Sequence, residues 1–350
     1  MDSFLSAVIK TTKRCNLSCD YCYDKDGEIE DRPIEEHIDK LMGEILSTDF
    51  ENIYFTWHGG EPLLKPISFY ENIAKIQRRF PNKKIRNGIQ SNLTLLTADA
   101  LLYLKELGFG IATSLDGPEE LTDINRHGLG VESVFDTIKK EIESMQLLDI
   151  RPKAVCVISQ TNLNHIRRLY EFFESMKIDI TVTPLIPNER YPKLNITPQE
   201  YGRALIELFD LWYGNEESNI KIIPFNHIMN GLLFGQSEYC MFSENCLNYY
   251  VNISPNGDIF PTCSKLNDSS FRIGNLKYDS ITTLDIRKAL ERAKMLRADS
   301  IKRYCQDCEY YFFCRGGCPA QHTNFSILEK DHFCISNRMI FDHISHILRQ

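Results

Sequence analysis

The sequence has no long apolar run, no excess of basic residues and no internal repeat, and these absences exclude several classes of protein. No apolar stretch approaches the roughly 20 residues that a membrane-spanning helix needs. Acidic residues outnumber basic ones by 48 to 40, and the net charge of −8 argues against a nucleic-acid partner, which would need a basic face. Residues 1–16 lack the basic region, long apolar stretch and cleavage site of a signal peptide. We therefore expect a cytoplasmic protein with no nucleic-acid and no membrane partner.

Cysteine, by contrast, is plentiful, with 12 in 350 residues. Disulfides are rare in a reducing compartment, so closely and regularly spaced cysteines are more often metal ligands. One group lies in KRCNLSCDYCYD, residues 13–24, and another in RYCQDCEYYFFCRGGCPA, residues 303–320. Cys156 stands apart in the middle of a predicted strand, and we interpret it as a small buried hydrophobic residue.

Short β-rich runs alternate with helical patterns through the first half of the chain. The predicted strands are 5–12, 52–57, 84–91, 109–114, 153–158 and 179–184. The predicted helices between them include 35–48, 97–108 and 162–176. Alternation repeated about six times predicts an α/β fold with a parallel sheet, either open or curved into a partial barrel. Ligands of such folds bind at the carboxyl ends of the strands.

The pattern changes after about residue 195. A helix predicted at 197–214 leads into a loop-rich region, and eight of the twelve cysteines lie between positions 240 and 334. We expect metal clusters, rather than a large apolar interior, to form the core of this second region. The predicted division is a barrel at 1–195, a helical connection at 196–235 and a second domain at 236–350.

The first cysteine group suits an iron–sulfur cluster with an open position. Cys15, Cys19 and Cys22 can bind three irons of a [4Fe–4S] cluster, which ordinarily takes four cysteines. No fourth ligand lies nearby, so one iron would be open to a small molecule. Zinc is the alternative, but it requires a fourth Cys or His, and the nearest histidine, His37, falls in a predicted helix.

This spacing of cysteine, three residues, cysteine, two residues, cysteine resembles the motif of the radical S-adenosylmethionine (SAM) enzymes. The residue before the last cysteine is usually aromatic in that family, and here it is Tyr21. The resemblance implies that SAM binds the open iron. One electron from the cluster would then cleave SAM to methionine and a 5′-deoxyadenosyl radical, which takes a hydrogen atom from the substrate.

Further motifs match the same family. TWHGGEP, residues 56–62, follows the second predicted strand, and the family uses its Gly-Gly-Glu-Pro to hold the methionine amino group. SLDGP at 114–118 and DINR at 123–126 also match, although Asp116 could equally cap the next turn. The resemblance implies SAM-binding roles for Tyr21, Gly59, Gly60, Glu61, Ser114, Asp116, Arg126 and, beside the adenine, Leu185.

The remaining eight cysteines make two sets of four, which suits two fully ligated [4Fe–4S] clusters, with two zinc sites as the alternative. Their arrangement resembles the SPASM domain, the C-terminal extension of radical SAM enzymes that mature peptides and proteins. The resemblance implies a first auxiliary cluster on Cys240, Cys246, Cys263 and Cys318, and a second on Cys305, Cys308, Cys314 and Cys334. The implied fold is a partial (β/α)6 TIM-like barrel followed by a loop-rich iron–sulfur SPASM domain, with SAM and three [4Fe–4S] clusters as cofactors.

The reaction is less specified. The layout is similar to that of the anaerobic sulfatase-maturating enzymes, which form formylglycine and carry an Asp base directly after the third SPASM cysteine. Here Ser264 follows Cys263, and a neutral hydroxyl is a poor base near neutral pH. The sequence therefore favours an enzyme that cross-links a ribosomally made peptide through a C–C cyclophane or a thioether, with formylglycine formation or epimerisation as alternatives. A non-catalytic electron carrier would not need the three-cysteine motif, the Gly-Gly-Glu-Pro turn or Arg126.

The expected partners follow from this chemistry. They are a precursor peptide or protein substrate and an external one-electron donor of the flavodoxin or ferredoxin type. The cluster motif begins at residue 15, so we expect no room for an N-terminal leader-binding domain. Leader recognition would then fall to the core fold or to a separate leader-binding protein, or it would be dispensable.

Overall fold

Six parallel strands form the centre of the structure, a computed structural model. It describes residues 4–25, 34–128, 130, 133–187, 189–237, 239–243, 250–260, 263, 272–281, 286–321 and 330–349, with only the backbone of 286–293. The strands are β1 (Phe4–Lys10), β2 (Asn52–His58), β3 (Lys84–Ser91), β4 (Phe109–Ser114), β5 (Lys153–Ile158) and β6 (Asp179–Pro184). All six predicted strands are confirmed, with end points within two residues.

The sheet extends beyond these six strands at both edges. Its order is β10-β9-β8-β1-β2-β3-β4-β5-β6-β7, and every neighbouring pair from β8 through β1 to β7 is parallel. The added strands are β7 (Ile222–Ile223), β8 (Tyr250–Ile253), β9 (Asp258–Phe260) and β10 (Gly274–Asn275). β9 and β10 are antiparallel to their neighbours. Strands from the predicted second domain therefore continue the sheet of the first.

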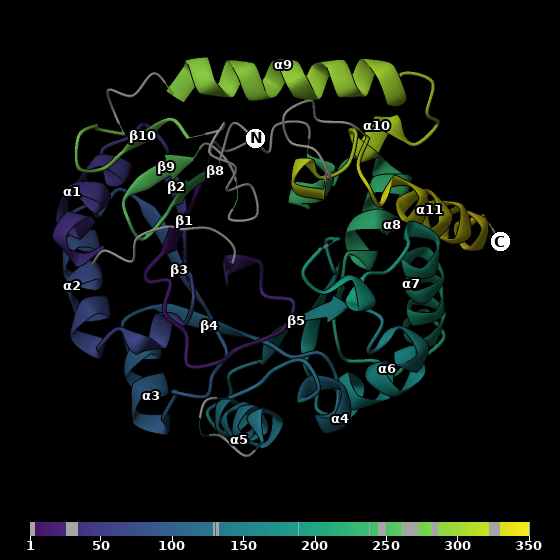
Figure 1. Cartoon of the computed structure of the whole chain (residues 1–350), viewed down its shortest axis with the longest axis horizontal. Coiled ribbons are helices and arrows are strands. Elements are labelled where there is room, and N and C mark those ends of the chain that lie inside the picture. The colour runs from purple at the N-terminus through teal and green to yellow at the C-terminus, as the bar shows by residue number, and fades with distance from the viewer. Residues whose placement is uncertain are drawn as a thin grey trace.

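Helices cover the outer face of the curved sheet (Figure 1). They are α1 (Glu35–Leu46), α2 (Ile67–Gln77), α3 (Ala98–Glu106), α4 (Glu119–Thr122), α5 (Val134–Leu147), α6 (Ile166–Ser175) and α7 (Pro198–Tyr213). Repeated strand–helix units that curve with helices outside form a partial TIM-like barrel, as the sequence predicts. No helix in the described part of the chain has the length and apolar character needed to cross a membrane.

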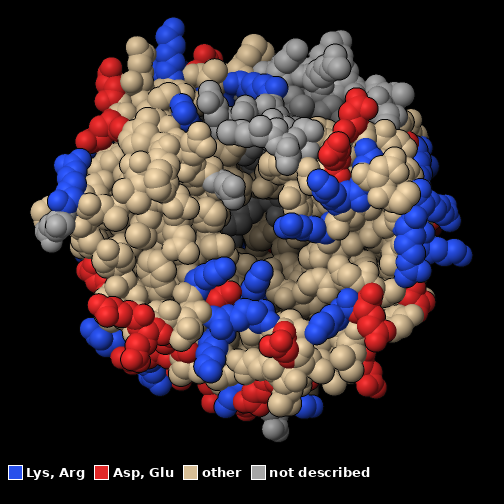
Figure 2. All heavy atoms as spheres, turned by 180° about the vertical axis from the view of Figure 1, so that it is seen from behind, with Lys and Arg blue, Asp and Glu red and all other residues tan. Residues whose placement is uncertain are grey.

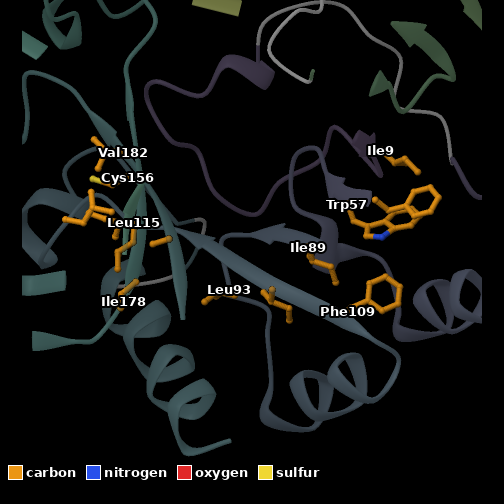
Figure 3. Close-up of a cluster of buried hydrophobic side chains, with 14 of the residues drawn as sticks. Ile9, Trp57, Ile89, Leu93, Phe109, Leu115, Cys156, Ile178 and Val182 are labelled. Atoms are coloured by element: carbon orange, nitrogen blue, oxygen red, sulfur yellow. The ribbon is translucent and has the colours of Figure 1, made fainter. Parts of the chain in front are cut away.

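The alternation of side chains along each strand separates the apolar core from the barrel interior. In β2, Ile53, Phe55 and Trp57 are almost completely buried, and Trp57 packs against Phe69 of α2 and Phe109 of β4 at ring-centroid distances of 5.9 and 6.4 Å. Successive side chains of a strand point to opposite faces, so the other residues of β2, ending at His58, face the interior. Figure 3 shows this buried cluster.

Cys156 lies in the same apolar layer, close to the labelled Val182 (Figure 3). Its side chain is fully buried, which confirms the interpretation of Cys156 as a buried hydrophobic residue. It therefore has a packing role.

The C-terminal region corrects one expectation. It contains α8 (Phe225–Phe234), α9 (Ile286–Tyr304), α10 (Tyr311–Cys314) and α11 (Cys334–Leu348). Phe313 packs against Phe242 and Phe341 at 5.8 and 4.7 Å, and all three belong to the same continuous apolar core as the barrel. The expectation of a core supplied by metal clusters in place of apolar packing was wrong for these residues. The boundaries near residues 195 and 235 stay a prediction.

Candidate functional site

The loop after β1 carries Cys15, Cys19 and Cys22, and neighbouring segments hold it in place. The Gly60 and Glu61 amides donate to the carbonyls of Thr12 and Arg14 at 2.8 and 2.9 Å. Farther along the loop, the Ser18 and Asp20 amides donate to the carbonyls of His127 and Asn125 at 2.7 and 2.9 Å. The loop is thus fixed at two places, both in segments that follow barrel strands. Figure 2 shows the molecule from behind, with a hollow at its centre and Lys and Arg side chains along part of the rim.

The three thiols on this loop are partly exposed and close enough to influence one another. The pKa of Cys15 is raised to about 11, mainly by burial and in smaller part by the neighbouring charges of Glu61, Cys19 and Cys22. The Cys15 sulfur accepts hydrogen bonds from the Leu17 amide at 3.3 Å and from the Asn92 side chain at 3.7 Å. Thiolates gathered in this way need nearby positive charge, which bound iron would supply.

The spread of these thiols bears on the choice between zinc and an iron–sulfur cluster. Within the described ranges, no group of three or more His, Cys, Asp or Glu side chains could hold a single metal ion. Zinc needs its ligands around one ion, whereas each thiolate of a [4Fe–4S] cluster binds a different iron. Three thiols on one loop are the kind of donor that a [4Fe–4S] cluster binds, one to each iron, so the donor set fits a cluster.

The two glycines of the Gly-Gly-Glu-Pro turn are needed because the cysteine loop lies directly against them. A Cβ atom on Gly59, whose φ is +115°, would lie 2.4 Å from the Thr12 carbonyl oxygen. A Cβ atom on Gly60 would lie 2.2 Å from the Arg14 carbonyl oxygen. Any larger residue would displace the loop, so the turn sets the position of the cysteine loop relative to β2.

Glu61 connects this turn to the end of β3. Its carboxylate, 1% exposed, accepts hydrogen bonds from the amides of Leu63 and Asn92 and from the Ser91 hydroxyl, each at 2.8 Å. Burial raises the pKa of Glu61, and these hydrogen bonds oppose that shift. Asn92 in turn reaches the Cys15 sulfur, so Glu61 positions the loop through Asn92.

Tyr21, which is half-buried, contacts the buried pair of Asp116 and Arg126. The Arg126 Nε and Nη2 atoms donate to the two Asp116 carboxylate oxygens at 2.9 and 3.3 Å, and Tyr21 donates its hydroxyl to Asp116. The Val157 amide donates to the same carboxylate at 3.0 Å. Arg126 also lies 5.5 Å from the centre of the Tyr21 ring. Asp116 therefore links the cysteine loop to the ends of β4 and β5, and the structure gives it a larger role than capping a turn.

The last two predicted SAM contacts lie at the same edge of the sheet. The Ser114 hydroxyl, at the end of β4, accepts a hydrogen bond from the Gln90 side chain at 3.0 Å. Leu185 directly follows β6, is 5% exposed, and donates its amide to the Ile158 carbonyl at 2.9 Å. All the SAM-binding residues implied by the sequence thus lie on the cysteine loop or near the carboxyl ends of strands.

Three further residues near the cysteine loop were not predicted as site residues. Lys10, at the end of β1, is 3% exposed and forms an ion pair with Asp24, which follows Cys22 by two residues. His58 pairs with Lys10 in the sheet, and its Nδ1 lies 3.9 Å from Asp24. A lysine at the end of an otherwise apolar strand is the sequence signal that could have indicated this group.

Four cysteines of the C-terminal region line one cavity of about 230 Å³. They are the set assigned to the second auxiliary cluster, namely Cys305, Cys308, Cys314 and Cys334. The pKa of Cys314 is raised to about 12, mainly by burial and in smaller part by the nearby Asp331, Cys334 and Cys305. The grouping of four mutually interacting thiols fits a fully ligated cluster.

The other auxiliary set is only partly described. Cys240 and Cys318 both lie near the Tyr239 side chain, where their charges add to the effect of burial and raise the Tyr239 pKa. Cys263 is partly buried, and Cys246 lies outside the described residues, as does Ser264. The assignment of this set stays a prediction.

Curated relatives match the chain over most of its length. It is 24% identical to the cysteine-type anaerobic sulfatase-maturating enzyme of Clostridium perfringens (strain 13 / Type A), and the match covers 97% of this chain and 96% of the relative. It is also 24% identical to the serine-type anaerobic sulfatase-maturating enzyme of Bacteroides thetaiotaomicron, over 87% of this chain and 80% of that enzyme.

The solved structures agree on the fold. Native anSMEcpe with bound AdoMet and Cp18Cys peptide superposes with a TM-score of 0.87 at 24% identity, covering 99% of this chain and 98% of that one. Streptococcus suis SuiB bound to S-adenosylmethionine superposes with a TM-score of 0.67 at 18% identity, covering 95% of this chain and 77% of SuiB. Residues 9–188, slightly more than half of the chain, match the radical SAM superfamily and include the cysteine loop and the Gly-Gly-Glu-Pro turn. The chain is an enzyme that belongs to the radical SAM superfamily.

Proposed function

We propose that this enzyme oxidises a cysteine or serine side chain of a protein or peptide to formylglycine, in the manner of the anaerobic sulfatase-maturating enzymes. The observation that carries the proposal is the extent of the match to the cysteine-type enzyme of C. perfringens, 97% of this chain and 96% of that enzyme. A match of that extent includes the C-terminal cysteine region as well as the barrel. A shared barrel alone would support only SAM chemistry.

This proposal differs from the cross-linking enzyme that the sequence favoured. That preference depended on Ser264, which stands where the sulfatase-maturating enzymes have an Asp base. The relatives support sulfatase maturation better, so another group would accept the substrate proton in this chain. Cross-linking remains the second candidate because of Ser264, and the experiment below distinguishes the two.

The net oxidation removes one hydrogen atom, one proton and one electron from the substrate, and the electron would pass to an auxiliary cluster. Serine would give the aldehyde directly, whereas cysteine would give a thioaldehyde that water hydrolyses to the aldehyde with release of hydrogen sulfide. The bound cluster and SAM would supply the radical that takes the hydrogen atom, with Cys15, Cys19 and Cys22 as the cluster ligands. The chain's own residues position these groups. The Gly59-Gly60 turn sets the place of the cysteine loop, and Asn92 orients Cys15.

The buried pair of Asp116 and Arg126 has a similar positioning role. It holds the hydroxyl of Tyr21, the residue directly before Cys22. Because both charges are almost fully buried, their geometry is fixed before SAM binds. We propose that SAM binds beside this group, between the cysteine loop and the ends of β2, β4 and β6.

The direct test is oxidation of a defined peptide under anaerobic conditions. The reconstituted enzyme would be incubated with SAM, a reductant and a synthetic peptide containing the cysteine that a sulfatase-maturating enzyme oxidises. Matched peptides would carry serine or alanine at that position. We expect an aldehyde, detected by hydrazide labelling and fragmentation, from the cysteine or the serine peptide and none from the alanine peptide.

A second substrate set separates the two candidate functions. Short peptides encoded beside the gene would be treated in the same way, and their intact masses measured. Loss of two hydrogens located between two side chains, together with unmodified sulfatase peptides, would replace the present proposal with cross-linking. The Cys19→Ala variant serves as the inactive control in both experiments.

A further inference from the structure

Asp331 contacts Cys318, one of the cysteines assigned to the first auxiliary cluster, and lines the cavity of the second set. Its side chain is 4% exposed. One carboxylate oxygen accepts a hydrogen bond from the Cys318 amide at 2.9 Å, and the other accepts from the Phe333 amide at 2.8 Å. Its backbone carbonyl accepts from the Cys334 amide at 3.0 Å. One residue therefore contacts Cys318 of the first set and Cys334 of the second.

The chain makes specific room for this carboxylate. Gly317 has a φ of +75°, and a Cβ atom there would lie 2.2 Å from the Asp331 Oδ2 atom. Any other residue at position 317 would push the carboxylate away from the Cys318 amide. The contact between the two cysteine segments thus depends on a glycine as well as on the acid.

Arg297 of α9 supplies the opposite charge at this place. It is 7% exposed and donates to the carbonyls of Ser243, Arg315 and Gly317 at 3.1, 3.1 and 3.2 Å. These carbonyls belong to the segments that follow Cys240 and Cys314. The Gly317 carbonyl that Arg297 contacts directly precedes Cys318, whose amide donates to the Asp331 carboxylate. The two buried charges lie together where the cysteine segments meet.

A turn at the start of a helix explains only part of this arrangement. The bond from Asp331 to the Phe333 amide is of the kind that precedes many helices, and α11 begins at Cys334. The bond from the Cys318 amide crosses to a different segment, and Asp331 lines the same cavity as Cys305, Cys314 and Cys334. The carboxylate therefore lies beside the four cysteines of the second set as well as beside Cys318.

We propose that Asp331 and Arg297 are positioning residues that hold the two auxiliary-cluster sites together and set the reduction potentials of the clusters bound there. The proposal depends on the cluster assignment within the proposed function, but not on the identity of the peptide substrate. The potential of an iron–sulfur cluster depends on the net charge around it and on hydrogen bonds to its sulfurs. A nearby carboxylate makes the cluster harder to reduce, and a nearby guanidinium makes it easier to reduce.

The test is a redox titration of the reconstituted, full-length enzyme followed by electron paramagnetic resonance. Asp331→Asn is expected to shift the auxiliary potentials upward, because asparagine has nearly the same shape as aspartate but no negative charge. Arg297→Gln is expected to shift them downward, whereas Arg297→Lys, which keeps the charge, stays near wild type. Asp299→Asn changes an exposed acid on the same helix as Arg297 and is expected to have no effect. The SAM-binding cluster, identified by its altered signal when SAM is added, serves as the internal reference and should not move.

The two variants are expected to shift the auxiliary potentials in opposite directions, so the experiment is decisive even if one variant loses its clusters. If Asp331→Asn does not retain iron, Arg297→Gln and Arg297→Lys still measure the effect of charge. Unchanged auxiliary potentials in Arg297→Gln, or shifts of the same sign in Asp331→Asn and Arg297→Gln, would overturn the proposal. Wild-type protein that binds the iron of a single cluster would also overturn it, without bearing on peptide oxidation. Conversely, a failed peptide assay alongside the expected shifts would reject only the proposed reaction.

Discussion

Arg126 and Asp116 form a two-point ion pair inside the protein, with Nε–Oδ2 and Nη2–Oδ1 distances of 2.9 and 3.3 Å. The side chains are only 6% and 2% exposed. Arg126 follows the short helix α4, whereas Asp116 directly follows the last residues of β4. The pair therefore joins the strand ends to the segment that holds the cysteine loop.

Replacing Arg126 with Met should leave the Asp116 charge buried without its partner. Removal of one member of a buried pair typically costs about 3–5 kcal/mol, so we expect a loss of that size in the free energy of unfolding. Urea denaturation followed by circular dichroism would measure it. Arg168→Met is the matched control, because Arg168 pairs with Glu120 at the surface and should cost less than about 1 kcal/mol. Equal losses in the two variants would contradict the structural role given to Arg126.

Gly60→Ala should disturb the cysteine loop, whereas Gly43→Ala should not. A Cβ atom on Gly60 meets the Arg14 backbone at 2.2 Å, but one on Gly43 meets nothing within 4 Å. We expect Gly60→Ala to lower the free energy of unfolding by about 1–3 kcal/mol through overpacking and to reduce iron binding. Gly43 lies inside α1, so Gly43→Ala should stabilise the helix by about 0.5–1 kcal/mol and leave iron binding unchanged. Normal iron content in Gly60→Ala would show that the loop tolerates the displacement.

The two cysteine regions should differ in how they affect SAM cleavage. Cys19→Ala is expected to abolish 5′-deoxyadenosine formation, because Cys19 is a ligand of the proposed SAM-binding cluster. Cys308 lines the separate C-terminal cavity, so the Cys308→Ala variant should retain some SAM cleavage while losing peptide product. Chromatographic measurement of 5′-deoxyadenosine and of modified peptide checks both variants. Wild-type levels of cleavage in Cys19→Ala would refute the assignment of the site.

Oxygen should inactivate the enzyme through the cluster held by only three cysteines. An iron without a protein ligand is open to attack, so we expect 5′-deoxyadenosine formation to be lost after exposure to air. SAM added before exposure should slow the loss, because it would occupy that iron. Activity after timed exposure, with and without SAM, provides the measurement. Full activity after prolonged exposure would argue against an open iron.

The sequence predicted the local features of this protein well. The six strands of the barrel were found because alternating β-branched and apolar residues bounded by turns are short-range signals. The cysteine loop and the Gly-Gly-Glu-Pro turn were identified by their resemblance to family motifs, which was possible because each lies within a few neighbouring residues. The position of both at the carboxyl ends of strands followed from the strand order alone.

Contacts between distant segments could not be obtained in this way. The sequence allowed two roles for Asp116, a SAM contact or the cap of a turn. Only the fold brings Asp116 to Arg126, Tyr21 and the Val157 amide. The buried Lys10–Asp24 pair escaped notice because its members are 14 positions apart and belong to no motif.

The C-terminal half shows the same difference between local features and contacts of distant segments. The cysteine count indicated two sets of four thiols, and the tertiary structure decided which thiols share a cavity. Asp331 lines this cavity together with Cys305, Cys308, Cys314 and Cys334. The sequence predicted a loop-rich domain there, yet β8 joins β1 and the aromatic residues of α10 and α11 extend the barrel's apolar core. The physical reason is that period and spacing record which face of an element is apolar, whereas the partner of that face is chosen by packing across the whole chain.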